Sequence, residues 1–274
     1  MKYWIFFLLL PFSVIANAQV YQTEPLSDEI HTIQVLKNGD WQQSPVIEIN
    51  SGDYIQLGFD RISEDSFNRL RYKIIHCNAD WTQSSLSEIE YLDGFNDNLI
   101  EDYAASMNTT VEYTNFRLII PNQDILRFKA SGNYAVLVYE EDNRDNVMLS
   151  ARFSVVDPQI VIAGNMSSNT LIDSNKSHQQ ISFILNHKGL NINDPYSDLK
   201  IFVRQNERQD NQKTDVKPTF IQPSRLVYEQ NRDLIFPAGN EYRRFDMPSS
   251  RYNGLRIYHM EYNRPFLQRL RSTR

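Results

Sequence analysis

Short runs of apolar residues with partial alternation recur along the chain, and helical periodicity is scarce. Such alternation, with abundant Val, Ile, Tyr and Phe, is typical of β-strands. In the first half, strands are predicted at residues 33–36, 46–49, 54–59, 70–77, 111–113, 116–120, 134–139 and 147–156. In the second half, they are predicted at residues 159–163, 180–186, 199–205, 225–228, 242–246 and 255–262.

Turn residues separate these runs. Asn38-Gly39-Asp40 suits a tight hairpin, because Asn and Gly tolerate a positive φ. Further Gly, Pro and Asn clusters lie between the other runs. Short strands at this spacing predict an antiparallel sandwich. The expected fold class is therefore all-β, with tandem antiparallel β-sandwich domains that are loosely immunoglobulin-like.

The chain is long enough for two domains of ordinary size. Asp157-Pro158 marks the predicted boundary, because proline ends a strand and holds the preceding residue extended. Residues 19–157 are expected to form an N-terminal β-sandwich domain, and residues 158–274 a second β-sandwich-like domain. Residues 205–217 are predicted to be a polar hairpin tip. The final segment, RPFLQRLRSTR, indicates a truncated second domain.

The first 18 residues have the pattern of a secretory signal peptide. Lys2 gives the positive start, residues 3–15 are apolar, and Ala16-Asn17-Ala18 fits the small-x-small cleavage pattern. The apolar stretch is shorter than the ~20 residues that a spanning helix needs. We therefore expect cleavage after Ala18 and a mature chain that does not itself span a membrane.

Charge divides unevenly between the two halves. Residues 19–157 hold 23 acidic and 10 basic side chains, a net charge of −13, whereas residues 158–274 hold 11 acidic and 17 basic, a net charge of +6. Such asymmetry can steer a partner or dock one domain on another. A secreted chain with an acidic first half is a poor candidate for binding nucleic acid.

Cys77 is the only cysteine, so an internal disulfide is impossible. A secreted chain without disulfides is typical of a bacterial envelope protein. Cys77 is predicted to be a small buried apolar residue at the end of a strand. A reactive thiol is the alternative, and His76 is the only basic neighbour that would favour the thiolate.

The most distinctive segment is residues 71–103, which begins as a strand and continues as a long acidic and aromatic loop. Long loops on β-domains are usually functional or disordered, and aromatic residues argue against disorder. Aromatic anchors within an acidic rim are typical of a protein interface, where rings supply buried area and charges supply steering. The residues predicted to bind a partner are Trp81, Tyr91, Asp93, Phe95, Asn96 and Asp97.

Three other kinds of chemistry have candidate residues in the sequence. Residues 93–98 have the composition of a calcium loop, but Phe95 stands where the second ligand belongs and Gly94 is second rather than sixth. A glycosidase-like pair could come from its carboxylates, although nothing singles out one pair. Carbohydrate could stack on four aromatic side chains, which are Trp41, Trp81, Tyr91 and Tyr103.

Motifs of the common enzyme classes are missing from the sequence: it has no nucleophile elbow, Walker loop, dinucleotide fingerprint or zinc-protease helix. The remaining histidines, at positions 31, 178, 187 and 259, are isolated in sequence. We therefore expect no catalytic residue, no metal site and no cofactor.

Several long phrases of the sequence resemble a known family. They are HCNADWTQSSLSEIEYLDGFNDNLIEDY, NTTVEYTNFRLIIPN, SGNYAVLVYEEDN, VMLSARFSVVD and PAGNEYRRFDMPSSRYNGLRI. They closely resemble the type 9 secretion system plug protein family of Bacteroidota, and the earlier phrases resemble its first domain. The likeness covers essentially all of residues 20–262.

The resemblance implies a periplasmic, non-enzymatic protein at the inner face of the outer membrane. Members of this family associate with the outer-membrane β-barrel translocon of type 9 secretion and close its periplasmic mouth when no substrate is passing. They are usually longer than this chain. The alternative interpretation from the residues alone is a carbohydrate-binding β-sandwich module of the bacterial envelope.

Overall fold

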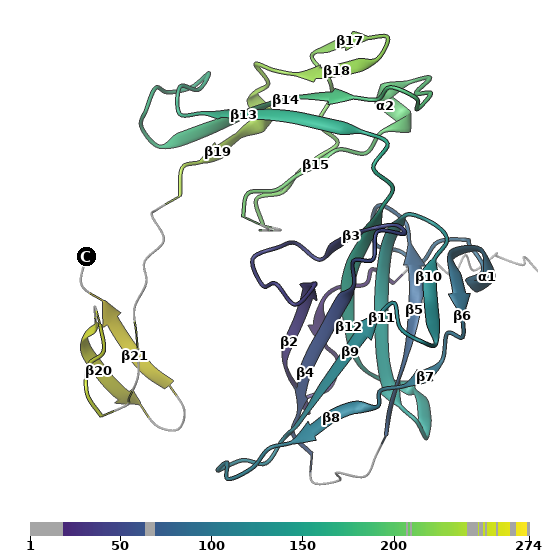
Figure 1. Cartoon of the computed structure of the whole chain (residues 1–274). Helices are drawn as coiled ribbons and strands as arrows, with labels where there is room; N and C mark the ends of the chain where they lie inside the picture. Colours follow the sequence, from purple (N-terminus) through teal and green to yellow (C-terminus); the bar gives the residue numbers. More distant parts are fainter. Residues whose placement is uncertain are drawn as a thin grey trace, which may run out of the picture. The chain divides into compact units, whose positions relative to one another are not determined.

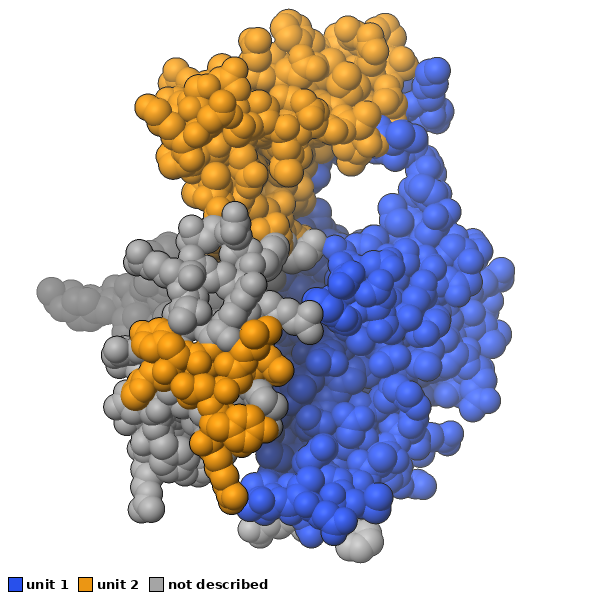
Figure 2. Space-filling view, turned by 60° about the vertical axis from the view of Figure 1, so that its left-hand side comes forward, with its two compact units in different colours: residues 1–161, 187–200 blue, residues 162–186, 201–274 orange. Residues whose placement is uncertain are grey.

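The computed structural model divides the chain into two compact units, coloured separately in Figure 2. Unit 1 comprises residues 1–161 and 187–200, and unit 2 comprises residues 162–186 and 201–274. The division predicted between residues 157 and 158 stays a prediction. The structure describes residues 19–63, 69–206, 208, 210–239, 246, 249, 251–255, 257–263 and 267–272.

Two sequence predictions fall outside the part of the chain that is described. The signal peptide predicted at residues 1–18 is one, and most of the strand predicted at residues 242–246 is the other. Across the described residues, the chain is mostly β, with several antiparallel sheets and very little helix. This confirms the expectation of a β-rich chain. No helix among these residues has the length and apolar character needed to cross a membrane.

The larger sheet of unit 1 has strands in the order β1-β12-β11-β5-β7. Strands β12, β11, β5 and β7 are labelled in Figure 1. A further strand, β3, pairs in parallel with β12, whereas the other pairs are antiparallel. The bounds are β1 Glu24–Pro25, β3 Val46–Glu48, β5 Leu70–Cys77, β7 Asn98–Leu99, β11 Gly132–Glu140 and β12 Asn143–Val156.

The second sheet of unit 1 is antiparallel, with the order β2-β4-β9-β8. Its strands are β2 Ile30–Lys37, β4 Ile55–Arg61, β8 Asp102–Ala105 and β9 Thr114–Ile120. A separate two-stranded ribbon joins β6 Leu92–Gly94 to β10 Ile125–Phe128. The unit also holds two four-residue helices, α1 Glu88–Tyr91 and α2 Pro195–Asp198.

Both sheets of unit 1 contribute to one hydrophobic core. Strand β4 alternates strictly, so that Ile55, Leu57 and Phe59 are buried while the residues between them are half-buried. Because successive side chains point to opposite faces of a strand, this alternation directs one face of β4 into the core. The rings of Tyr134 and Phe153, from β11 and β12, stack there with their centroids 5.4 Å apart.

Unit 2 is built on a sheet with the order β13-β14-β18-β17, and β19 also pairs with β14. Its strands are β13 Val161–Ser167, β14 His178–Asn186, β17 Phe220–Gln222, β18 Arg225–Tyr228 and β19 Ile235–Pro237. A short 3-10 helix, η1 Arg232–Leu234, precedes β19. Two further ribbons pair β15 Phe202–Val203 with β16 Lys213–Thr214, and β20 Ile257–Asn263 with β21 Leu267–Ser272.

The strand predicted at residues 111–113 is wrong. In the structure these residues close the turn between β8 and β9. Two hydroxyl side chains engage the backbone there: Thr109 Oγ1 donates to the carbonyl of Val111 at 2.8 Å, and the N–H of Tyr113 donates to Ser106 Oγ at 3.0 Å. Local side-chain hydrogen bonds of this kind compete with strand pairing.

Candidate functional site

Residues 78–100, the edge-capping loop, close the open edge of β5. β7 pairs with Arg71 and Tyr72, and the N–H of Ile100 donates to the carbonyl of Leu70 at 2.9 Å. At the other end of β5, the N–H of Ser84 donates to the carbonyl of His76 at 2.9 Å. An unpaired strand edge is a template for aggregation, so a loop that covers it protects the sheet.

Asn96 pairs with the middle of β5 as a neighbouring strand would. The backbone N–H of Ile74 donates to Asn96 Oδ1 at 2.7 Å, and Asn96 Nδ2 donates to the carbonyl of Ile74 at 2.8 Å. The side-chain amide therefore reproduces the paired donor and acceptor of a peptide group. The sequence predicts Asn96 as a partner-binding residue. In the structure, its side chain instead satisfies the backbone of β5.

Tyr91 is buried at the end of α1. Its hydroxyl donates to the carbonyl of Ile74 at 3.0 Å, and its ring meets that of Tyr134 edge-on, with centroids 6.0 Å apart. Burial raises the pKa of Tyr91 to about 12. The helix begins with a capping box in which the backbone N–H of Ser87 donates to Glu90 at 2.7 Å. One turn of helix thus directs Tyr91 into the core.

The two acidic residues predicted for the site lie in ion pairs. Asp97 Oδ1 accepts from Arg71 Nε at 2.6 Å and from the Tyr139 hydroxyl at 2.8 Å. Burial alone would raise the pKa of Asp97, but the hydrogen bonds from Arg71 and Tyr139 outweigh it and the pKa is lowered. Asp93 pairs with Arg127 at 2.9 Å. Within the described ranges, no group of three or more His, Cys, Asp or Glu residues could hold a metal ion.

Trp81 covers the outer face of the larger sheet. Its ring lies 4.4 Å from the guanidinium carbon of Arg152, and its carbonyl accepts from the N–H of Tyr21 at 3.1 Å. It packs against a small apolar cluster that includes Cys77. Burial raises the pKa of the Cys77 thiol to about 11, which disfavours the reactive thiolate. The prediction of a buried cysteine at a strand end is confirmed.

Phe95 is the predicted site residue that remains at the surface, with 81% of the residue exposed. Gly94 has a φ of +125°, and a Cβ there would collide with the carbonyl oxygen of Asp124. The N–H of Phe95 donates to the same oxygen at 3.0 Å. The close approach of Gly94 to the Asp124 carbonyl, which only glycine permits, therefore fixes the backbone beside the exposed Phe95 ring.

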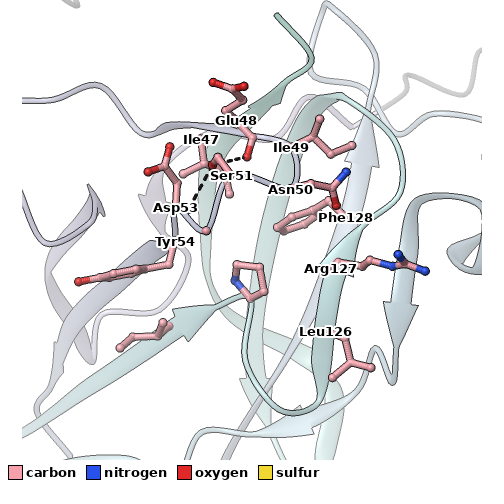
Figure 3. Close-up of a pocket in the computed structure, with 13 residues that line it drawn as sticks. Ile47, Glu48, Ile49, Asn50, Ser51, Asp53, Tyr54, Leu126, Arg127 and Phe128 are labelled. Carbon is pink, nitrogen blue, oxygen red and sulfur yellow. Dashed lines mark hydrogen bonds between the residues drawn. The ribbon is translucent and has the colours of Figure 1, made fainter.

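A cleft of about 440 Å³ lies between the turn after β3 and strand β10 (Figure 3). Ile47 and Phe128, both buried, belong to its apolar part, and Leu126 and Arg127 lie on the β10 side. Sequence reasoning missed this cleft. The turn on one side, Ser51-Gly52-Asp53, has the composition of a turn in the sequence, but the facing strand β10 is distant along the chain.

The polar residues of the cleft stabilise its turn. Ser51 Oγ donates to the carbonyl of Glu48 at 2.8 Å, and the N–H of Asp53 donates to Ser51 Oγ at 3.2 Å (Figure 3). A hydrogen bond from Asn38, then one from Lys37, lowers the pKa of Asp53 to about 2. The Ser51 hydroxyl is therefore directed to a backbone carbonyl rather than to a basic side chain.

Unit 2 brings a serine, a histidine and an aspartate together near the start of β14. His178 Nδ1 lies 3.0 Å from Ser177 Oγ and 2.8 Å from Asp173 Oδ2. In a catalytic triad, the serine and the acid contact opposite nitrogens of the imidazole. Here both contact the same nitrogen, so the cluster closes a turn and lacks the geometry for nucleophilic catalysis.

The side chains considered for carbohydrate binding separate into two groups. Tyr91 is buried and Trp81 is half-buried, whereas Trp41 and Tyr103 are exposed. The ring of Tyr103 lies 5.6 Å from that of Phe116. The carbohydrate interpretation stays a prediction that depends on the two exposed rings.

The fold and the site define a mostly β protein whose most distinctive loop closes a sheet edge and presents one aromatic ring. Residues 30–157 match the sequence model of the type 9 secretion system plug protein first domain. This part of the chain belongs to that family of secretion-system plug proteins, as the sequence predicts.

A solved structure resembles the chain over a longer stretch. The chain is 44% identical to a hypothetical protein from Parabacteroides merdae ATCC 43184 whose crystal structure is known, with a TM-score of 0.83. The match covers 92% of this chain and 63% of that protein, so the chain spans less than two thirds of its relative's length. No curated protein matches the chain.

Proposed function

We propose that this protein is a non-enzymatic periplasmic plug or accessory subunit that caps the periplasmic mouth of the outer-membrane translocon of type 9 secretion. The observation that carries the proposal is the match of residues 30–157 to the first domain of the plug proteins. In this account, residues 1–18 are removed on export and the mature chain acts at the inner face of the outer membrane.

The proposed mechanism is steric. We assign unit 1 to the immunoglobulin-like sandwiches, because two sheets share one core and antiparallel pairing predominates. Unit 2 is proposed as a second domain of similar type. Occlusion of a pore requires a preorganised surface of sufficient area rather than a reactive group. The edge-capping loop, which hydrogen bonds and ion pairs hold against β5 and β10, would supply such a surface on unit 1.

The proposed translocon contact centres on Phe95. The carboxylates and the amide predicted for the same site hold the loop in place, through Asp93 with Arg127, Asp97 with Arg71, and Asn96 with Ile74. Exposed aromatic anchors often dominate the energy of an interface. The rigid loop would therefore present Phe95 at little further cost in conformational entropy.

Replacement of Phe95 by alanine tests this contact. We expect recovery of the variant with the purified translocon barrel to fall by about tenfold or more, as is typical for the loss of an aromatic anchor. Trp41→Ala is the matched control, because Trp41 is an aromatic residue of similar exposure, 78%, outside the edge-capping loop.

The thermal unfolding temperatures of both variants must equal that of the parent chain. Equal recovery of a folded Phe95→Ala variant and the parent would remove Phe95 from the interface. If the parent chain itself fails to co-purify with the barrel, the capping function is wrong.

A further inference from the structure

Strand β8 is an open edge of the second sheet. It pairs with β9 on one side, and no other strand of the described residues pairs with it (Figure 1). All of its residues, Asp102 to Ala105, are exposed. The register with β9 runs without a bulge from Asp102 opposite Arg117 to Ala105 opposite Thr114. β8 therefore presents a regular strand edge to solvent.

The ladder shows which backbone groups face outward. The N–H of Ser106 donates to the carbonyl of Tyr113 at 2.8 Å, and this pair continues the β8–β9 register. Hydrogen-bonded and non-hydrogen-bonded pairs alternate along an antiparallel ladder. Ala104 is therefore bonded to β9, whereas the N–H and C=O groups of Tyr103 and Ala105 point away from it. Nothing in the described part of the chain accepts or donates a hydrogen bond at these groups.

The other sheet edges of unit 1 are short or irregular. In the larger sheet, the edge-capping loop covers β5, and the outermost strands β1, β3 and β7 have only two or three residues each. Strand β2 carries a register shift between His31 and Gln34, with Thr32 at a φ of +55°. Very short edge strands and bulges are among the usual means of preventing unwanted strand pairing. β8 has four residues and no bulge, although it belongs to the same domain.

Charge and apolar surface near β8 indicate what would pair with it. Residues 101–113 contain three acidic side chains and no basic one. Asp102 already pairs with Arg117 of β9 at 2.7 Å, so the acidic charge that could attract a partner is that of the other two, Glu101 and Glu112. Tyr103 is 62% exposed on the strand, and Met107 is 84% exposed in the turn beyond it. An extended segment with basic residues and apolar residues in alternation would match both features.

We propose that β8 binds an extended basic segment of a second protein by strand addition. The outward groups of Tyr103 and Ala105 form the new ladder, apolar side chains of the partner pack beside Tyr103, and its basic side chains face the carboxylates of residues 101–113. A second copy of this chain is a poor occupant, because its own β8, Asp102 to Ala105, has no basic side chain to face these carboxylates. This inference does not rest on the translocon contact proposed for Phe95.

The test uses the mature chain and a synthetic nine-residue peptide in which lysine and valine alternate. Its matched control is the same peptide N-methylated at the five central residues, which keeps the charge and removes the backbone donors. We expect N-methylation to weaken binding, measured by fluorescence anisotropy, by about tenfold or more. A glutamate-for-lysine peptide should bind no better than the N-methylated one.

Amide exchange measured by NMR locates the binding. We expect the Tyr103 and Ala105 amides to exchange rapidly in the free protein and slowly with the peptide. The amide of Ala104 is the internal control, because it is bonded to β9 in both states. Ala105→Pro removes an N–H that points away from β9 and leaves the hydrogen bonds between β8 and β9 in place. It should weaken binding by about tenfold.

Several results would overturn the proposal. They are equal binding of the plain and N-methylated peptides, protection elsewhere than at Tyr103 and Ala105, or self-association of the chain through β8 in sedimentation measurements. If Ala105→Pro fails to fold, the peptide comparison on the unaltered protein still decides the question.

Discussion

At the scale of single residues, Asn96 connects an unusual loop sequence to the stability of the central sheet. Its side-chain amide pairs with both backbone groups of Ile74, a fully buried residue of β5. The Tyr91 hydroxyl also donates to the Ile74 carbonyl. The carbonyl thus has two donors, whereas the Ile74 N–H has Asn96 as its acceptor.

Asn96→Ala is expected to destabilise unit 1 by about 1–3 kcal/mol, because it leaves a buried N–H without an acceptor. Urea unfolding followed by tryptophan fluorescence measures this free energy. Gln34→Ala, which removes an exposed side-chain amide on β2, is the control and should change it by less than about 0.5 kcal/mol. Equal effects of the two substitutions would show that Asn96 does not cap the edge of β5.

The sequence could indicate which residues of the loop are unusual but not the roles of individual side chains. Tyr91 and Phe95 are both aromatic residues in an acidic context, yet Tyr91 is buried and Phe95 is exposed. The difference depends on the turn of α1 and on the approach of Gly94 to Asp124, both of which are tertiary features. Likewise, the sequence could not reveal the pairing of Asn96 with Ile74, because the two residues lie 22 positions apart.

At the scale of elements, the turn between β13 and β14 is stabilised by one carboxylate. Asp173 Oδ2 accepts from the Ser177 hydroxyl at 3.0 Å and lies 2.8 Å from His178 Nδ1. The hydrogen bond with His178, followed by those from Ser177 and Thr170, lowers the pKa of Asp173 from 3.8 to about 2. The charged form is therefore favoured in the folded state.

This shift predicts a pH dependence of stability. Because the folded pKa of Asp173 lies below the unfolded value, its contribution is present above about pH 4 and is lost as the pH falls toward 2. We expect Asp173→Asn to lower the melting temperature at pH 6 and to have little effect at pH 2, as measured by calorimetry. A constant difference between the two proteins across this range would contradict the assignment.

The strands with clear alternation could be predicted from the sequence, and the pairing of short ones could not. The runs predicted at residues 70–77 and 225–228 coincide with β5 and β18. The sequence predicts a long loop after β5, and in the structure this segment contains α1, β6, β7 and the start of β8. Elements of two to four residues carry too little periodic signal to be recognised, and they form because a neighbouring strand supplies their hydrogen bonds.

At the scale of the whole molecule, family membership was predictable because the matching phrases are long and unusual in composition. Residues 30–157 carry that identity. The open edge of β8 and the cleft near Phe128 were not predictable. Each depends on which strands lie side by side in the folded chain, and these strands are distant in sequence.

The most direct measurement is the ionic conductance of the purified translocon barrel in a planar bilayer. The mature chain is added first to one side and then, in a separate experiment, to the other. We expect conductance to fall when the chain is added on the periplasmic side and to remain unchanged when it is added on the opposite side. Unchanged conductance on periplasmic addition, with the chain demonstrably bound to the barrel, would contradict the proposal that this protein caps the pore.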